Sequence, residues 1–298
     1  MNRRILSGAV VYHFSPDAEP RWYIAPGEKV QVQCPDGMHG TIQTEEDLYL
    51  QVDPDRVNDA VGPIYIEGAR AGTTLCVSIE RITVPSTQGY VLLIPGFGLL
   101  KDRIERAVTK ICPIEDGCVN FDGVRIPLDP CIGTIGVAPA QGRISTLYPG
   151  DHGGNMDTTD IRSGVNLYLP VFVDGALLAM GDGKAVMGDG EVCGTGVGVP
   201  LNIDLTCTVR DPIPVRRPII ETADSWMTIG SAPTLEEAAR VATLDMIALL
   251  QASHGFSFER AYMFTSLVGH LKISQVVDPW MTVRMSIDKR YLSKPLVP

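Results

Sequence analysis

Apolar and polar residues alternate with a period of two along several stretches of the chain. The period holds over residues 74–79, 165–173 and 201–209, where every second side chain is Leu, Val, Ile or Cys. This pattern is typical of half-buried β-strands. In the middle stretch Pro170 lies on the opposite face and favours an edge or bulged position, because proline cannot donate to a strand ladder. The first two thirds of the chain are therefore predicted to be strands joined by glycine-rich turns.

The pattern changes in the last third of the chain. Thr234 and Glu237 form a capping box, after which apolar residues recur at helical spacing until Gly255. Ser257 begins a second, shorter predicted helix, and residues 273–277 and 281–287 follow as two strands. The chain is thus predicted to be mainly β. Residues 1–210 are predicted to form a sandwich or barrel that carries the functional site. A smaller C-terminal α+β part, residues 211–298, packs on it, and the proline-rich residues 210–218 form the seam.

Charge and cysteine content exclude several classes of function. The 298 residues include 25 Lys and Arg against 35 Asp and Glu, a net charge of −10, so we expect no nucleic-acid partner. No apolar run is long enough to cross a membrane and no signal peptide is evident, which favours a soluble, cytoplasmic protein without a membrane partner. Seven cysteines without a Cys-x-x-Cys pair indicate neither a disulfide framework nor a structural zinc site.

Candidate chemistry concentrates in two glycine-rich segments. Residues 149–157 and 181–194 together contain the polar side chains Asp151, His152, Asn155, Asp157, Asp182, Lys184, Asp189 and Glu191. Carboxylates with a histidine and a lysine can bind a cation or perform acid–base chemistry. Asp36 lies in a third glycine-rich loop that could face the same cleft.

Structural roles compete with these chemical ones. Asp-Gly is a common hairpin turn, so Asp182 and Asp189 can be explained by turn formation alone. Glu191 differs, because it precedes the apolar Val192 and Cys193, and a carboxylate that enters a β core requires a partner. Cys193 can be read either as a nucleophile beside Glu191 or as a buried thiol.

Seven motifs resemble those of the acetamidase/formamidase family, in the same order along nearly the whole chain. They are Phe14-Ser-Pro-Asp17, Gly62-Pro-Ile-Tyr-Ile-Glu-Gly-Ala69, Ile132-Gly-Thr-Ile-Gly-Val-Ala-Pro139, Pro149-Gly-Asp-His-Gly-Gly-Asn-Met-Asp157, Leu167-Tyr-Leu-Pro-Val171, Gly188-Asp-Gly-Glu-Val-Cys-Gly-Thr195 and Gln275-Val-Val-Asp-Pro279. The resemblance implies hydrolysis of the C–N bond of a small linear amide, such as formamide or acetamide, to ammonia and a carboxylate. It also implies a jelly-roll-like β body, a homodimer or higher homo-oligomer, and a divalent metal ion, zinc or calcium.

The resemblance assigns residues one by one, with one departure. Asp36 matches an acidic position of the family's N-terminal loop, and the other matched positions are His152, Asn155, Asp157, Asp182, Asp189 and Glu191. Where the family usually has a histidine, this chain has Lys184, and an amine must lose its proton before it can ligate a metal. Three alternatives stay open: the lysine ammonium takes the place of the cation, the metal is held by carboxylates and His152, or the activity is lost or altered.

The resulting hypothesis is an amidohydrolase that activates water with carboxylates. Glu191, with Asp36 or Asp189, is the predicted general base, and Lys184 or a cation stabilises the oxyanion. The amide is expected at Gly153, Gly154 and Asn155, and the metal at His152, Asp157 and Asp182. The alternatives are an amidase with a Cys193 nucleophile and a remodelled, non-catalytic binding member of the family.

Overall fold

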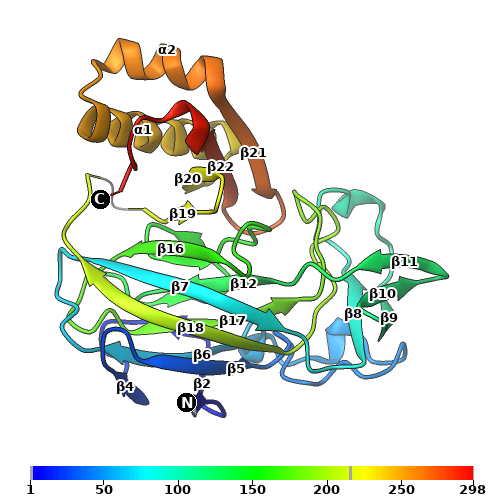
Figure 1. Cartoon of the computed structure of the whole chain (residues 1–298). Coiled ribbons are helices and arrows are strands. Elements are labelled where there is room, and N and C mark those ends of the chain that lie inside the picture. Colours follow the sequence, from blue (N-terminus) through cyan, green and yellow to red (C-terminus); the bar gives the residue numbers. More distant parts are fainter. Residues whose placement is uncertain (1–2, 215–216, 298) are drawn as a thin grey trace.

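Two β-sheets packed face to face form the body of the molecule, and two C-terminal helices lie on one side of it (Figure 1). The computed structural model describes residues 3–214 and 217–297. Over these residues the larger sheet has nine strands, in the order β1-β5-β18-β7-β16-β19-β20-β22-β21. The smaller sheet has the order β14-β15-β12-β17-β6-β2, with β4 also paired to β6.

The strands have the following bounds. Those of the larger sheet are β1 (Arg4–Leu6), β5 (Lys29–Cys34), β7 (Thr74–Thr83), β16 (Val165–Pro170), β18 (Leu201–Arg210), β19 (Ile219–Glu221), β20 (Ser225–Ala232), β21 (Gly269–Gln275) and β22 (Met281–Asp288). Those of the smaller sheet are β2 (Val10–Val11), β4 (Trp22–Ile24), β6 (Ala60–Ile66), β12 (Cys131–Gly136), β14 (Pro149–Gly150), β15 (Gly153–Asn155) and β17 (Leu178–Lys184). Further strands are β8 (Gln88–Leu93), β9 (Val108–Glu115), β10 (Cys118–Phe121) and β11 (Val124–Pro127) in one sheet, and β3 (His13–Phe14) with β13 (Ile144–Ser145). Short 3-10 turns occur at Tyr49–Gln51, Pro54–Arg56, Lys101–Arg103 and Lys289–Tyr291.

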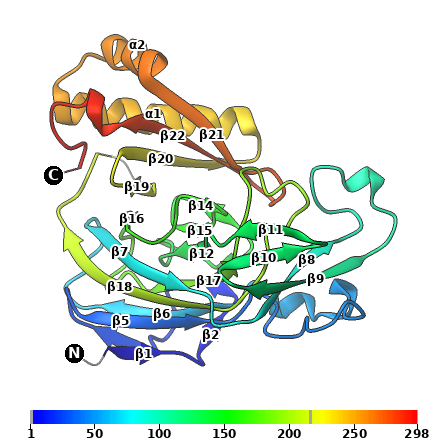
Figure 2. The same ribbon diagram turned by 45° about the vertical axis from the view of Figure 1, so that its right-hand side comes forward.

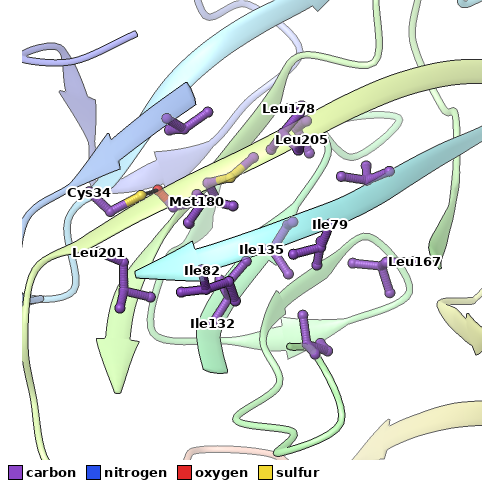
Figure 3. Packing of buried hydrophobic residues seen from close by; sticks show 14 of the residues in the cluster. Cys34, Ile79, Ile82, Ile132, Ile135, Leu167, Leu178, Met180, Leu201 and Leu205 are labelled. Carbon is purple, nitrogen blue, oxygen red and sulfur yellow. Dashed lines mark hydrogen bonds between the residues drawn. The ribbon is translucent and has the colours of Figure 1, made fainter. Parts of the chain in front are cut away.

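The core lies between the two large sheets. The three stretches of alternating residues form β7, β16 and β18, which are neighbours in the larger sheet. Ile79 and Leu167 from this sheet gather with Ile132 and Ile135 of β12 in the smaller sheet (Figure 3). Full burial of each such side chain contributes about 1.5–3 kcal/mol to the free energy of unfolding. The predicted sandwich is therefore confirmed.

The edge position predicted from Pro170 is wrong for β16 as a whole. β16 lies between β7 and β19. However, β19 accompanies it only from Asn166 to Tyr168, while Pro170 has a partner, Thr74, on the β7 side. Pro170, which has no N–H donor, therefore lies where β16 has a neighbouring strand on one side only.

Both predicted helices are present, as α1 (Leu235–His254) and α2 (Phe258–Val268). The Thr234 side chain accepts a hydrogen bond from the Glu237 N–H at the start of α1, and Gly255 ends it in the left-handed conformation. α1 packs directly on β20 at Gly230, where a Cβ atom would lie 2.7 Å from the Ala242 nitrogen. Within the described ranges, no helix is long and apolar enough to cross a membrane.

The C-terminal part continues the larger sheet. β19 pairs with β16, and β20, β22 and β21 follow outward from it, beneath the helices (Figure 2). Arg217 adds a link, with ion pairs to Asp151 at 2.9 Å and to Asp245 of α1 at 3.1 Å. The predicted seam includes residues 215–216, which lie outside the described residues. The C-terminal part is thus fixed against the edge of the body where the glycine-rich segments lie.

Candidate active site

The ammonium group of Lys184, at the end of β17, is buried among carboxylates. Its Nζ atom lies 3.0 Å from Asp182 Oδ1, 3.0 Å from Glu191 Oε1 and 3.7 Å from Asp157 Oδ1. Only 7% of the lysine side chain is exposed. An ammonium group has three N–H donors. The two 3.0 Å contacts engage two of them, and Asp157 Oδ1, at 3.7 Å, is too distant to accept a hydrogen bond from the third. One N–H therefore remains for a bound molecule.

A glycine lets the carboxylates converge. β12 lies between β15, which precedes Asp157, and β17, which carries Asp182. A Cβ atom at Gly133 of β12 would lie 2.5 Å from Asp157 Oδ1 and closer still to Asp182 Oδ2. The carboxylates can face each other across β12 only because this position has no side chain.

The three acidic residues around Lys184 share an uncommon backbone conformation. The φ angles of Asp157, Asp182 and Glu191 are 40°, 53° and 43°. Left-handed conformations of residues other than glycine cost about 1–3 kcal/mol each and are concentrated at functional sites. The turn interpretation of Asp182 is wrong, because Asp182 and Gly183 lie inside β17. The sequence predicts that Glu191 needs a partner, and the structure shows that this partner is Lys184.

Asp278, in the loop between β21 and β22, adds a fourth carboxylate from the C-terminal part. Its Oδ2 atom accepts a hydrogen bond of 2.9 Å from Asn155 Nδ2. Asn155 is itself held, because its Oδ1 atom accepts hydrogen bonds from Asn58 and Thr134. Sequence reasoning assigned no role to Asp278 and placed the site within residues 1–210. The sequence held one signal that could have identified Asp278: it is an aspartate directly after two apolar residues, in a motif of the family that the chain resembles.

The loop that carries Glu191 is tied to the C-terminal part. The Gly190 N–H donates to the Ser274 carbonyl at 2.8 Å. Arg284, which is almost fully buried on β22, contacts Asp189 Oδ1 at 2.7 Å and Asp160 Oδ2 at 2.6 Å. Asp189 is 46% exposed and does not line the cavity that Glu191 faces. The structure therefore places Asp189 as an anchor of the loop, away from the position expected of a general base.

Burial and charge act together on the protonation of the cluster. Burial alone would lower the pKa of Lys184, but the charges of Asp182, Glu191 and Asp157 raise it well above its usual value. Burial raises the pKa of Asp157 and of Asp278 well above the usual range, and neighbouring carboxylates raise both further. Burial also raises the pKa of Glu191, although Lys184 opposes the shift. The cluster thus combines a charged lysine with carboxyl groups that hold protons readily.

A cavity of about 230 Å³ opens above these groups. Its floor consists of Asp157, Asp182, Lys184, Glu191 and Asp278, with Asn155 beside them. Its walls are mostly apolar and include Met38, Tyr49, Val57, Ile94, Phe97 and Leu147. A small molecule can therefore contact the charged floor while apolar side chains exclude water around it.

Several predicted site residues lie elsewhere. The Asp36 carboxylate lines a neighbouring cavity and accepts hydrogen bonds from the Met38 and Gly40 N–H groups, so it stabilises a turn. Gly153 and Gly154 do not line the cavity of Lys184, and their missing side chains allow β15 to pack against neighbouring strands.

The Cys193 thiol also lies outside the cavity. It donates to the Thr195 carbonyl at 3.4 Å, and Cys193 is not among the residues that line the cavity floor or walls. A nucleophile must reach the carbonyl carbon of its substrate. This position does not favour the Cys193 alternative.

The proposed metal ligands do not converge on one point. His152 lines a separate cavity, contacts Phe14 edge to face with ring centroids 4.9 Å apart, and has its pKa lowered to about 4 by burial. Lys184 Nζ lies between the carboxylates of Asp157 and Asp182. In the part of the chain that the structure describes, no group of three His, Cys, Asp or Glu could hold a metal ion. These positions do not fit the predicted zinc or calcium ion, and the metal stays a prediction.

A β-sandwich with a lysine and carboxylates at the floor of a small cavity has the groups of an enzyme that uses acid–base chemistry. Comparison with known proteins agrees with this class. The model of the acetamidase/formamidase family matches residues 7–146 and 140–288. The chain belongs to the acetamidase/formamidase family.

Similar proteins and solved structures support this membership. The chain is 26% identical to a formamidase of Methylophilus methylotrophus, over 91% of this chain and 86% of that protein. An acetamidase structure from Bacillus halodurans is 39% identical with a TM-score of 0.94, covering 96% of this chain and 98% of the other. A predicted acetamidase/formamidase from Thermoanaerobacter tengcongensis is 40% identical with a TM-score of 0.92, covering 95% and 94%. The resemblance inferred from the motifs is confirmed.

Proposed function

We propose that Lys184 and Glu191 together hydrolyse a linear amide in this cavity. The protein is a hydrolase of carbon–nitrogen bonds other than peptide bonds, as its family membership indicates. The observation that carries the assignment of residues is the buried contact of 3.0 Å between Lys184 Nζ and Glu191 Oε1 at the cavity floor. It joins a permanent positive charge to a carboxylate with a raised pKa.

In the proposed mechanism Glu191 is the general base. Its Oε1 atom is occupied by Lys184 and by the Gly196 N–H at 2.9 Å, so Oε2 is the oxygen that accepts a proton from the attacking water. The water oxygen bonds to the amide carbon, and the remaining N–H of Lys184 stabilises the oxyanion that forms. Glu191 then passes its proton to the amide nitrogen, the C–N bond breaks, and ammonia and a carboxylic acid are released.

Asp157, Asp182 and Asp278 support this chemistry without attacking the substrate. Asp182 holds Lys184 in place at 3.0 Å, and Asn155 holds Asp278 beside the floor. The raised pKa values of Asp157 and Asp278 favour their protonated forms, which limits the negative charge that the oxyanion meets. The homo-oligomer and the cytoplasmic location implied by the resemblance stay predictions.

Glu191→Gln tests the assignment of the base. Ammonia release from formamide, acetamide and propionamide should fall by about 10²–10⁴-fold in kcat, because the amide cannot accept the proton. The variant should still fold and unfold in one cooperative thermal transition, since Gln can still accept from the Gly196 N–H. Glu221→Gln is the matched control, because Glu221 also contacts a lysine, Lys289 at 2.8 Å, but lies outside the cavity. Full turnover by folded Glu191→Gln would show that another group is the base.

A further inference from the structure

The walls of the cavity differ in chemistry from its floor. Met38, Tyr49 and Phe97, which line the cavity, also pack against a small apolar core of Ile42, Tyr90, Leu92 and Ile94. Val57 and Leu147 extend the apolar surface from two other segments. The side of the cavity that faces away from the reacting groups is therefore part of a continuous apolar cluster.

Three polar side chains on these walls, Tyr90, Asn58 and Thr195, are already engaged. The Tyr90 hydroxyl donates to the Asp36 carbonyl, and Asn58 Nδ2 donates to the Thr146 carbonyl at 2.8 Å. Thr195 Oγ1 accepts from the Leu92 N–H at 3.0 Å. A polar substituent placed here would lose its bonds to water without recovering them from these groups, which costs free energy. The four carboxyl groups at the floor would in addition disfavour an anionic substituent.

The volume sets the size of the group that fits. A cavity of about 230 Å³ has room for several waters. Formamide and acetamide have three and four non-hydrogen atoms, so either would leave much of the apolar wall in contact with water. An amide with a larger apolar acyl group would remove that water and gain binding free energy.

We infer that the cavity selects primary amides whose acyl group is an apolar chain of about four or five carbons, over formamide and acetamide. The amide group contacts Lys184 and Glu191, and the hydrocarbon chain lies against Phe97, Met38 and Leu147. This inference rests on the proposed function and names its substrate class.

A homologous series of substrates tests the inference on the unmodified protein. We expect kcat/KM for ammonia release to rise about fourfold per methylene, and so about 60-fold from acetamide to valeramide. It should then fall for octanamide, which exceeds the cavity. 4-Hydroxybutyramide matches valeramide in size but ends in a hydroxyl group, and it should react more slowly than valeramide. Equal or higher kcat/KM for acetamide, or for the hydroxylated amide, would overturn the inference and leave the proposed function intact. Ammonia from none of these amides would overturn both.

Two substitutions locate the selectivity in the wall. Phe97→Ala should lower the ratio of kcat/KM for valeramide to that for acetamide, because it removes apolar contact. Leu147→Phe should lower the same ratio by filling the space. Phe121→Ala is the matched control: Phe121 is a partly exposed phenylalanine of β10 outside the cavity, and the ratio should not change. An unchanged ratio in both wall variants would overturn the assignment.

Discussion

Replacement of Lys184 by methionine removes the positive charge that faces Asp157, Asp182 and Glu191 while keeping a chain of similar length. Lys184 forms two ion pairs with N···O distances of 3.0 Å in a buried setting. Removal of the lysine would leave these carboxylates buried without the opposite charge. We therefore expect a decrease of about 3–5 kcal/mol in the free energy of unfolding near neutral pH, the range found when one partner of a buried ion pair is removed.

The loss of stability in Lys184→Met should depend on pH. The pKa of Lys184 is raised above its ordinary value of 10.5, so its contribution is fully present below that pH in the wild-type protein. In Lys184→Met the carboxyl groups of Asp157 and Glu191 lose the charge that lowers their pKa, so they hold protons to higher pH. Protonation relieves the repulsion between these carboxyl groups at low pH. The difference in free energy of unfolding between Lys184→Met and wild type should therefore be smaller at pH 5 than at pH 8. Turnover should fall by about 10²–10³-fold with the oxyanion donor.

Urea unfolding at both pH values, with ammonia release from the same preparations, measures these effects. Lys110→Met is the matched control, because Lys110 also contacts two carboxylates, Asp122 at 2.7 Å and Glu45 at 3.2 Å, but at the surface. Solvent screens such pairs, so this variant should unfold and turn over like wild type. Lys184→Met with wild-type turnover and an unchanged urea midpoint at pH 8 would refute both roles of the lysine.

Three further substitutions test the packing of the floor, the proton on Asp278 and the alternative nucleophile. Gly133→Ala should lose most turnover because its Cβ atom would displace the Asp182 carboxylate. Gly188→Ala is the control and should keep its turnover, because there is open space around the Cβ position. Equal kcat values for the two variants would contradict the role of Gly133 in packing. The raised pKa of Asp278 means that the folded protein binds its proton more tightly than the unfolded chain, so its contribution to stability is lost as pH rises above about 4. The free energy of unfolding of Asp278→Asn, measured with urea, should therefore increase relative to that of wild type from pH 4 to pH 8. A decrease over this range would show that Asp278 does not hold a proton in the folded protein. Cys193→Ser should retain turnover in the ammonia assay, and inactivation of the folded variant would revive the thiol nucleophile.

Much of the fold follows from local patterns. The side chain of Thr234 and the left-handed Gly255 bound α1 where the capping signals predict, because both act within a few residues. The alternating stretches became strands because the pattern places the apolar side chains on one face. The prediction of half-buried strands is wrong for much of β7 and β16, since Cys76 and Tyr168 on the opposite face are also buried, in the core beneath the helices. The exact place of β16 in the sheet was missed, since proline at one end restricts a single position, while the neighbours of a strand depend on the whole topology.

The site was predictable where its residues share a segment. Asp182, Lys184 and Glu191 lie close in sequence and stay together in space. Asp278 comes from a loop that follows the helices, and no period or spacing links it to Asn155. His152, although only three residues from Asn155, faces a different cavity. Contacts between distant segments, and the direction of each side chain, are properties of the packed structure.

Charge explains why lysine suits position 184 in this chain. Four carboxyl groups meet at the floor of one cavity, and each ionised group raises the free energy of ionising the next. A neutral histidine, the residue that the family usually has here, would leave this repulsion unopposed unless a cation were also bound. The ammonium group of Lys184 supplies the opposing charge from within the chain, at 3.0 Å from both Asp182 and Glu191. In the proposed mechanism the same group keeps one N–H donor for the substrate, so that charge balance at the floor and stabilisation of the oxyanion would depend on a single side chain.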